Sequence, residues 1–202
     1  MSSASLERQR ELVKGDVLLA FDFDGTLAPI VAEPADASMR DKTHTQLQQL
    51  AERYPVVIIS GRSRSDVLGR VQGIQLAAVI GNHGSEADGG AEVLESTQHR
   101  QLLERWLPVL EACVKAHSGL VLEDKALSVA IHYRHATDPM RARNAILEIA
   151  AQLDSARVVS GQQVVNIVPI AAANKGEALM RIRSRLGLTS AIYVGDDETD
   201  ED

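Results

Sequence analysis

Short apolar runs that end in polar turns constrain the fold of this chain more than any other feature. They occupy Val17–Phe23, Val56–Ile59 and Leu76–Ile80, and a fourth at Ser190–Val194 ends in Gly195. Each is rich in Val, Ile, Leu or Ala and too short for a helix, so each is predicted to form a buried strand. Aromatic residues make up only 3% of the chain, so aliphatic side chains must build most of the core.

Segments of helical composition alternate with these runs. Ser38–Arg53, with Ser38 as the expected N-cap, and Ser65–Val71 lie between the first three runs, and Lys175–Leu186 precedes the last. Alternation of strand, helix and strand predicts a parallel sheet with helices on its faces, which is an α/β fold.

The pattern changes after Gly81. The next part of the chain has the order helix, hairpin, helix, hairpin, which predicts a separate α+β unit inserted into the core. Asp138 followed by Pro139 marks the start of the second helix, because Asp is a favourable N-cap and Pro suits the first helical position. The expected elements are the helices Thr97–Ala116, with a kink at Pro108, and Asp138–Leu153, and the hairpins Leu120–Glu123 with Leu127–Tyr133 and Arg157–Ser160 with Gln163–Val168.

These patterns predict two domains within the 202 residues. A split α/β core with a parallel sheet is expected over residues 16–82 and 170–202, and an inserted α+β cap over residues 83–169. Residues 1–15 precede the core as an N-terminal extension.

Acidic side chains follow the ends of two predicted strands. Asp22 and Asp24 close the first strand, and the alternation of a strand places both on the same side. Two carboxylates this close repel unless a cation lies between them or one is protonated. Because ligands of open α/β sheets bind beyond the carboxyl ends of the strands, five aspartates are expected to converge on one crevice. They are Asp22, Asp24, Asp196, Asp197 and Asp200.

A hydroxyl and an ammonium complete this set. Ser60 ends the second strand, and Lys175 opens the helix before the last strand. Oxygen ligands suit Mg²⁺, and a carboxylate can attack phosphorus to form an aspartyl phosphate. A second carboxyl can protonate the leaving oxygen and then activate water, while the hydroxyl and the ammonium hold the phosphoryl oxygens. The strand ends therefore predict magnesium-dependent phosphoryl transfer.

The same residues resemble the four motifs of the haloacid dehalogenase superfamily of phosphatases. These motifs are Asp22–Thr26, Ser60–Arg62, Asn174–Gly176 and Gly195–Asp200. Within the superfamily, the sequence is similar to the trehalose-6-phosphate phosphatases through Gly81–Glu86, Glu123–Lys125, His132–Arg134 and Glu198–Asp202. The resemblance covers about residues 18–202. It implies a Rossmann-like core with an inserted cap, and a hydrolase of trehalose biosynthesis.

The resemblance also implies catalytic and metal-binding roles. Asp22 is the expected nucleophile and Asp24 the expected general acid and base, while Ser60 and Lys175 hold the phosphate. The expected Mg²⁺ ligands are Asp22, the backbone carbonyl of Asp24 and Asp196, with support from Asp197 or Asp200.

Substrate contacts are implied for a further group of residues, which comprises Arg62, Glu86, Glu123, Lys125 and Asn166. The family usually has a Glu and then a basic residue in the strand before the lysine motif, where this chain has Asn166. An amide can hydrogen-bond a hydroxyl but brings no negative charge. The expected reaction is hydrolysis of trehalose 6-phosphate to trehalose and phosphate. The alternatives are a phosphatase for another sugar phosphate, such as a sucrose or mannosyl-glycerate phosphate, and a non-catalytic module that binds a sugar phosphate.

The remaining expectations concern partners and surroundings. A net charge of −7 disfavours nucleic acid and anionic membranes as partners. The expected partner is a small-molecule substrate, a sugar phosphate, and a monomer is the expected state. Cys113 is the one cysteine, which excludes an intrachain disulfide. With no secretory signal in Met1–Gly15, a cytoplasmic location is predicted. Because the relatives continue through another helix and strand, the core is expected to lack its C-terminal elements beyond Asp202.

Overall fold

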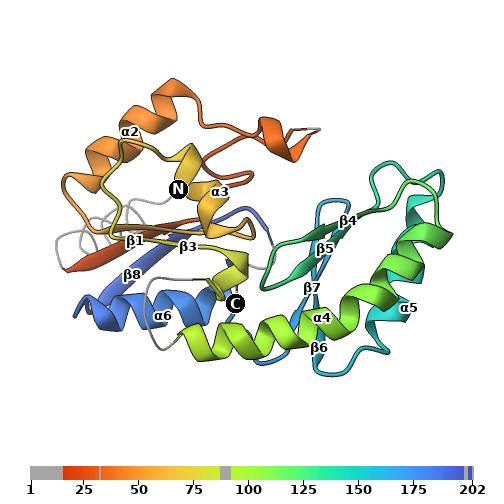
Figure 1. Cartoon of the computed structure of the whole chain (residues 1–202). Helices are drawn as coiled ribbons and strands as arrows, with labels where there is room; N and C mark the ends of the chain where they lie inside the picture. The colour runs from red at the N-terminus through yellow and green to blue at the C-terminus, as the bar shows by residue number, and fades with distance from the viewer. Residues whose placement is uncertain (1–15, 32, 87–91, 198–199, 202) are drawn as a thin grey trace. The chain divides into compact units, whose positions relative to one another are not determined.

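The computed structural model describes residues 16–31, 33–86, 92–197 and 200–201. The chain divides into two compact units, Met1–Asp88 with Ala173–Asp202, and Gly89–Ala172. Figure 1 shows that each unit has its own sheet. The division lies a few residues later at both crossings than the sequence patterns predict. In the described part of the chain, no helix is long and apolar enough to cross a membrane.

The first unit contains a four-stranded parallel sheet in the order β3-β2-β1-β8. Its strands are β1 (Val17–Phe21), β2 (Val56–Ile59), β3 (Ala78–Ile80) and β8 (Ser190–Val194). β1 pairs with β2 on one side and β8 on the other, so that Leu19 lies opposite both Val56 and Ile192. This sheet confirms the predicted α/β core.

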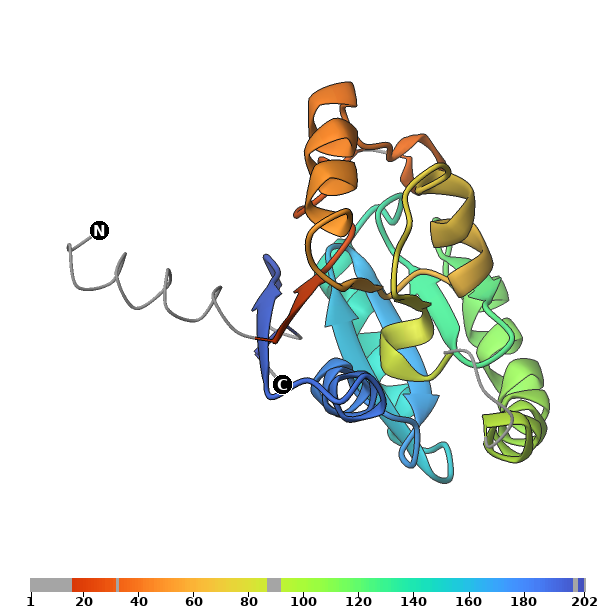
Figure 2. The same ribbon diagram turned by 90° about the vertical axis from the view of Figure 1, so that its left-hand side faces the viewer.

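Alternate side chains of β1 enter two apolar clusters on opposite faces of the sheet. On one face, Val17 and Leu19 pack in the cluster that contains Leu47 of α2 (Asp41–Ala51) and Val67 of α3 (Arg64–Arg70). On the other face, Leu18 and Ala20 pack in the cluster that contains Ala178 and Ile182 of α6 (Lys175–Arg185). Figure 2 shows α6 on the opposite side of the sheet from α2 and α3. The helices therefore cover both faces of this sheet.

Two short 3₁₀ turns complete the described part of this unit, η1 (Pro34–Asp36) and η2 (Asn82–Gly84). The start of α2 differs from the prediction. The N-cap is Arg40, which makes no side-chain capping bond, so the predicted cap at Ser38 is wrong.

The second unit contains a four-stranded antiparallel sheet in the order β4-β5-β7-β6. The predicted hairpins correspond to neighbouring pairs in this sheet, and β5 also pairs with β7. The strands are β4 (Val121–Asp124), β5 (Val129–His132), β6 (Ala156–Gly161) and β7 (Val164–Pro169).

Two helices, α4 (Glu92–Ala116) and α5 (Pro139–Ala150), share one apolar cluster with this sheet. Its fully buried members come from α4, α5, β5 and β7, and include Leu103, Leu110, Ile146, Val129, Ile131, Val165 and Ile167. The predicted N-cap of α5 is confirmed, because Asp138 Oδ1 accepts a 3.0 Å hydrogen bond from the Arg141 N–H. α4 runs as one helix through Pro108.

We expect Ile146→Ala to destabilise the second unit by about 2–5 kcal/mol, because truncation of a fully buried side chain leaves a cavity. Trp106, the single tryptophan of the chain, lies in the same cluster, so its fluorescence during urea unfolding reports on this unit. Met140→Ala, in the same helix but 67% exposed, is the control and should change stability by less than about 0.5 kcal/mol. Equal losses for the two variants would contradict the packing.

Candidate active site

A buried ion pair lies at the carboxyl end of the parallel sheet. Asp22 directly follows β1, and its N–H donates to the Val194 carbonyl of β8. Lys175 is the first residue of α6, and its Nζ donates to Asp22 Oδ1 over 3.0 Å. The two side chains are only 6–7% exposed. Asn174 holds Lys175 in place by capping α6, together with Glu177, in a capping box.

Burial and the neighbouring charges shift the pKa values of this pair. Burial raises the pKa of Asp22 to about 6, although the charge of Lys175 acts in the opposite direction. Burial acts to lower the pKa of Lys175, but the charges and hydrogen bonds of Asp22 and Asp200 outweigh it, and the pKa lies above its usual value. Lys175 therefore keeps a positive charge at this end of the sheet, between two carboxylates.

The carboxylate of Asp200 joins several parts of the site. Its Oδ1 accepts from Lys175 Nζ at 2.6 Å and from the Tyr193 hydroxyl at 2.9 Å. Its Oδ2 accepts from the backbone N–H groups of Asp196 and Asp197, both at 3.0 Å. Burial acts to raise the pKa of Asp200, but its hydrogen bonds and the Lys175 charge outweigh burial, so the net pKa lies below its usual value. An ionised carboxylate has about four acceptor directions, and all of them have donors here. Asp200 therefore positions Lys175 and the turn after β8.

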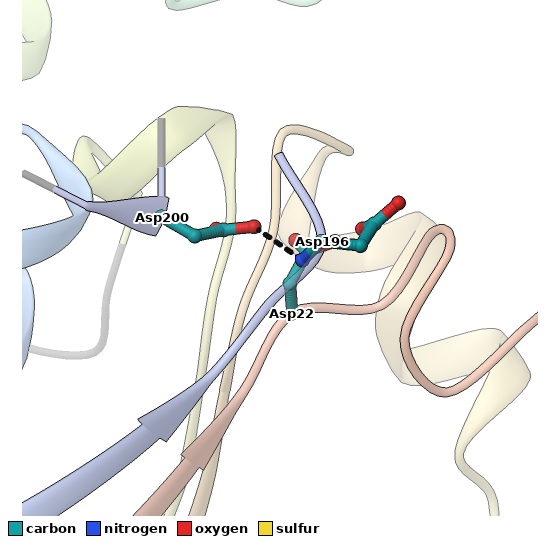
Figure 3. Close-up of side chains that lie close together, drawn as sticks. All are labelled: Asp22, Asp196 and Asp200. Atoms are coloured by element: carbon teal, nitrogen blue, oxygen red, sulfur yellow. Dashed lines mark hydrogen bonds between the residues drawn. The ribbon is translucent and has the colours of Figure 1, made fainter. Parts of the chain in front are cut away.

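Three carboxylates form a candidate metal site in the described part of the chain. Oxygens of Asp22, Asp196 and Asp200 lie within 4.8 Å of one another. Figure 3 shows Asp22 and Asp196 just beyond the ends of β1 and β8, and the Asp200 side chain, from a separate segment, directed at the Asp196 N–H. Burial and the charges of Asp200 and Asp197 raise the pKa of Asp196. A cation would relieve this repulsion, and an oxygen-only donor set fits a hard cation such as Mg²⁺.

The turn after β1 brings the backbone close to this cluster. Gly25 has a φ of +84°, and a Cβ at this position would collide with the Asp196 carboxylate. Thr26 Oγ1 lies 3.5 Å from Asp196 Oδ1 and donates to it. Asp197, another predicted metal-site residue, is exposed on the neighbouring turn.

The other predicted residues of the first unit bind protein groups, and three of them, Ser60, Arg62 and Asp24, are linked to one another. Arg62 donates to both carboxylate oxygens of Asp24, over 2.7 and 2.8 Å. Ser60 is buried at the end of β2, and its Oγ accepts from the Arg62 N–H at 3.2 Å. Glu86 Oε2 accepts from the Arg64 N–H and from Asn82 Nδ2, at 2.7 and 2.8 Å. Glu86 thus anchors the turn at η2, where Asn82 adopts a positive φ.

The predicted sugar-binding residues of the second unit share one side of its sheet. Glu123 lies opposite Ala130 in the next strand, and Ala130 lies opposite Asn166. Such cross-strand neighbours project to the same face. Lys125 Nζ lies 3.4 Å from Asn166 Oδ1, and His132 Nε2 lies 2.9 Å from Glu123 Oε2. Acid, base and amide groups are therefore grouped on the face opposite the apolar cluster that contains Ile131.

Sequence reasoning missed two contributors to the first site. Tyr193 is predicted from the sequence only as part of a buried strand, yet its hydroxyl binds Asp200. Asp66 binds Arg62 and Arg70, both over four-residue spacings, with distances of 2.7 and 3.0 Å. That spacing, Arg-x-x-x-Asp-x-x-x-Arg, is visible in the sequence and is typical of paired charges on a helix.

The parallel core, the inserted antiparallel unit and the aspartates at the strand ends are the architecture of haloacid dehalogenase-type phosphatases. A comparison with protein families gives a finer result, because the profile of trehalose-phosphatases matches residues 20–202. The chain belongs to the trehalose-phosphatase family.

Individual relatives agree with this family. The trehalose-phosphate phosphatase of Mycobacterium avium is 34% identical over 203 residues, which are 90% of this chain and 49% of that protein. A probable trehalose-phosphate phosphatase of rice, Oryza sativa subsp. japonica, is 30% identical, over 98% of this chain and 60% of that protein. The chain thus spans about half the length of the curated relatives that it matches. The fold matches the C-terminal domain of a trehalose-6-phosphate phosphatase from C. albicans, with a TM-score of 0.78 and 24% identity over 95% of this chain and 73% of that one.

We expect Asp200→Asn to lower the free energy of unfolding of the first unit by about 3 kcal/mol, because the amide keeps only one accepting oxygen, its NH2 group faces donors that bond to a carboxylate oxygen in the wild type, and Lys175 is left with Asp22 as its one carboxylate partner of the two described here. Chemical denaturation followed by circular dichroism, with a chelator present to exclude metal effects, measures this loss. Asp197→Asn is the control, since that side chain is exposed and the same turn is retained. Comparable stability of the two variants would show that Asp200 does not hold the site together.

Proposed function

We propose that this chain catalyses the magnesium-dependent hydrolysis of trehalose 6-phosphate to trehalose and inorganic phosphate, through an aspartyl phosphate on Asp22. The observation that carries the proposal is the buried Asp22–Lys175 pair, 3.0 Å apart and next to Asp196, in a chain of the trehalose-phosphatase family. A carboxylate beside a fixed ammonium combines a nucleophile with a binding group for phosphoryl oxygens.

The first step transfers the phosphoryl group to the protein. A carboxylate oxygen of Asp22 forms a bond to phosphorus as the bond from phosphorus to the sugar oxygen breaks. Asp24 donates a proton to the leaving sugar oxygen. Lys175 and Ser60, which lie at the starts of a helix and a turn, bind the phosphoryl oxygens as their charge redistributes.

The second step regenerates the carboxylate of Asp22. Asp24, now ionised, takes a proton from a water molecule, and the water oxygen attacks phosphorus. The bond between phosphorus and Asp22 breaks, which releases inorganic phosphate. One carboxyl thus serves as acid in the first transfer and as base in the second.

Magnesium would be held by Asp22, Asp196 and the backbone carbonyl of Asp24. When bound, it neutralises charge on the transferring phosphoryl group. Asp200 supports this site by fixing the turn that carries Asp196 and Asp197.

The second unit supplies the sugar contacts in this proposal. Glu123, Lys125 and Asn166 offer acceptors and donors to hydroxyl groups from one side of an antiparallel sheet. Glu86 would add a contact from the first unit. Asn166 also favours a second candidate within the same chemistry, a phosphatase for another sugar phosphate, because its neutral amide does not reproduce the charge of the carboxylate that is usual at this position.

Phosphate release from a panel of sugar phosphates, with Mg²⁺ or with a chelator, tests the reaction and the substrate together. We expect release from trehalose 6-phosphate that is lost on chelation. Release from another member of the panel would retain the chemistry and replace the sugar. Absence of release from every member, with Mg²⁺ present and the chain folded, would favour a non-catalytic binding module.

We expect Asp22→Asn to abolish turnover, because an amide cannot form the phosphoryl ester, while the protein remains folded. Asp16→Asn is the matched control, since Asp16 is exposed and lies before β1, at the opposite end of the strand from Asp22. Incubation with radiolabelled substrate followed by denaturation should leave label on the wild-type chain and on the control variant, but not on Asp22→Asn. Retained turnover by Asp22→Asn would rule out this nucleophile.

A further inference from the structure

We infer that Arg62 is a positioning residue for Asp24 and acts on proton transfer through that carboxylate, without binding the phosphate of the substrate. The inference deepens the proposed function and rests on it, because the proposed function gives Asp24 the proton-transfer role. It also differs from the role as a substrate contact that the sequence suggested for Arg62.

The contact between the two side chains fixes the plane of the carboxyl group. Arg62 Nε donates to Asp24 Oδ2 over 2.7 Å, and Arg62 Nη2 donates to Asp24 Oδ1 over 2.8 Å. Such a two-pronged pair is among the most directional of protein hydrogen-bond arrangements. The Arg62 side chain is 12% exposed and that of Asp24 is 40% exposed. Each Asp24 oxygen keeps a further lone pair, so the carboxyl can exchange a proton while it is held.

Other groups immobilise the guanidinium itself. Arg62 Nη1 donates to Asp66 Oδ2 over 2.7 Å, and Nη2 also donates to the Pro34 carbonyl over 2.8 Å. The guanidinium lies over the Phe23 ring, 5.7 Å from its centroid, which is within the range of a cation–π contact. The guanidinium has five N–H donors, and it makes four hydrogen bonds to protein acceptors.

The chain of contacts continues into α3 and η1. Arg70 Nε donates to Asp66 Oδ1 over 3.0 Å, and Arg70 Nη1 donates to the carbonyls of Ala35 and Ala37. Ser63 caps α3 by accepting from the Asp66 N–H. Asp66 is therefore held by its backbone contact with Ser63 and by its side-chain contact with Arg70. Its position in turn fixes the orientation of the Arg62 guanidinium.

This arrangement has a direct consequence for the first proton transfer. The O–H bond of Asp24 breaks as an O–H bond forms on the leaving sugar oxygen, so a carboxylate remains that faces two charge-assisted donors of Arg62. A misplaced acid loses its catalytic effect, because proton transfer needs hydrogen-bond reach. Loss of Arg62 should therefore reduce turnover without weakening the binding of the sugar phosphate.

Steady-state phosphate release separates this role from direct substrate binding. For Arg62→Gln we expect kcat to fall about 10²-fold with KM unchanged, within the range of general acid–base catalysis. Arg62→Lys should recover part of kcat, because an ammonium keeps the charge but cannot hold both oxygens in a fork. Arg53→Gln, at an exposed arginine after α2, is the control with both constants unchanged. A raised KM for Arg62→Gln with kcat retained would overturn the inference in favour of phosphate binding.

A double-mutant cycle with Asp24→Asn distinguishes an effect of Arg62 through Asp24 from a general structural defect. If Arg62 acts through Asp24, Arg62→Gln causes no further loss in the Asp24→Asn background. Equal losses in both backgrounds would overturn the inference, and thermal unfolding of all four proteins checks that each is folded. The cycle uses whichever ester of the panel the wild type hydrolyses. If the wild type is active and the two losses are additive, the inference is wrong but the proposed function stands. If the wild type is inactive on every ester, the proposed function is wrong as well.

Discussion

The ion pairs of the buried Lys175 ammonium are the interactions on which the rest of the candidate active site depends. Lys175, the first residue of α6, bonds to Asp22 after β1 and to Asp200 after β8. One cation therefore connects the start of α6 to the segments that follow two strands. Removal of a partner from a buried ion pair is destabilising, but Lys175 keeps one carboxylate when either Asp22 or Asp200 is replaced. Asp200 extends the connection to the turn that carries Asp196, so the Lys175 ammonium and the backbone that carries the Asp196 carboxylate share one support.

Much of this arrangement can be predicted from the sequence, because it follows from where strands end. β2 and β8 have the predicted bounds, and parallel strands bring their carboxyl ends to one edge. The order of the motifs along the chain is therefore enough to predict that Asp22, Lys175 and Asp196 lie near one another. The inserted unit is equally predictable, since its two hairpins alternate with two long helical segments.

The remaining features depend on side-chain partners, which a sequence does not specify. Ser38 is a favourable capping residue at the start of its segment, yet α2 starts after Arg40, so the backbone path overrides local preference. Asp200 and Asp197 look equivalent in the motif, and only the four donors around the Asp200 carboxylate distinguish them. Arg62 looks like a positive charge that is available to a substrate, but Asp24 and Asp66 occupy its donors.

The place of β1 between β2 and β8 has a consequence for how the chain acquires its structure during synthesis. β8 pairs with β1 although the two segments are separated by about the whole chain, and Ser190 bonds to the carbonyl of Asp16 across 174 positions. Until the ribosome has made β8, one edge of β1 has no partner, and an unpaired edge favours wrong pairing. The antiparallel unit is completed first, from its own local hairpins. Lys175 then follows, and the ammonium meets both carboxylates only when the last turn emerges.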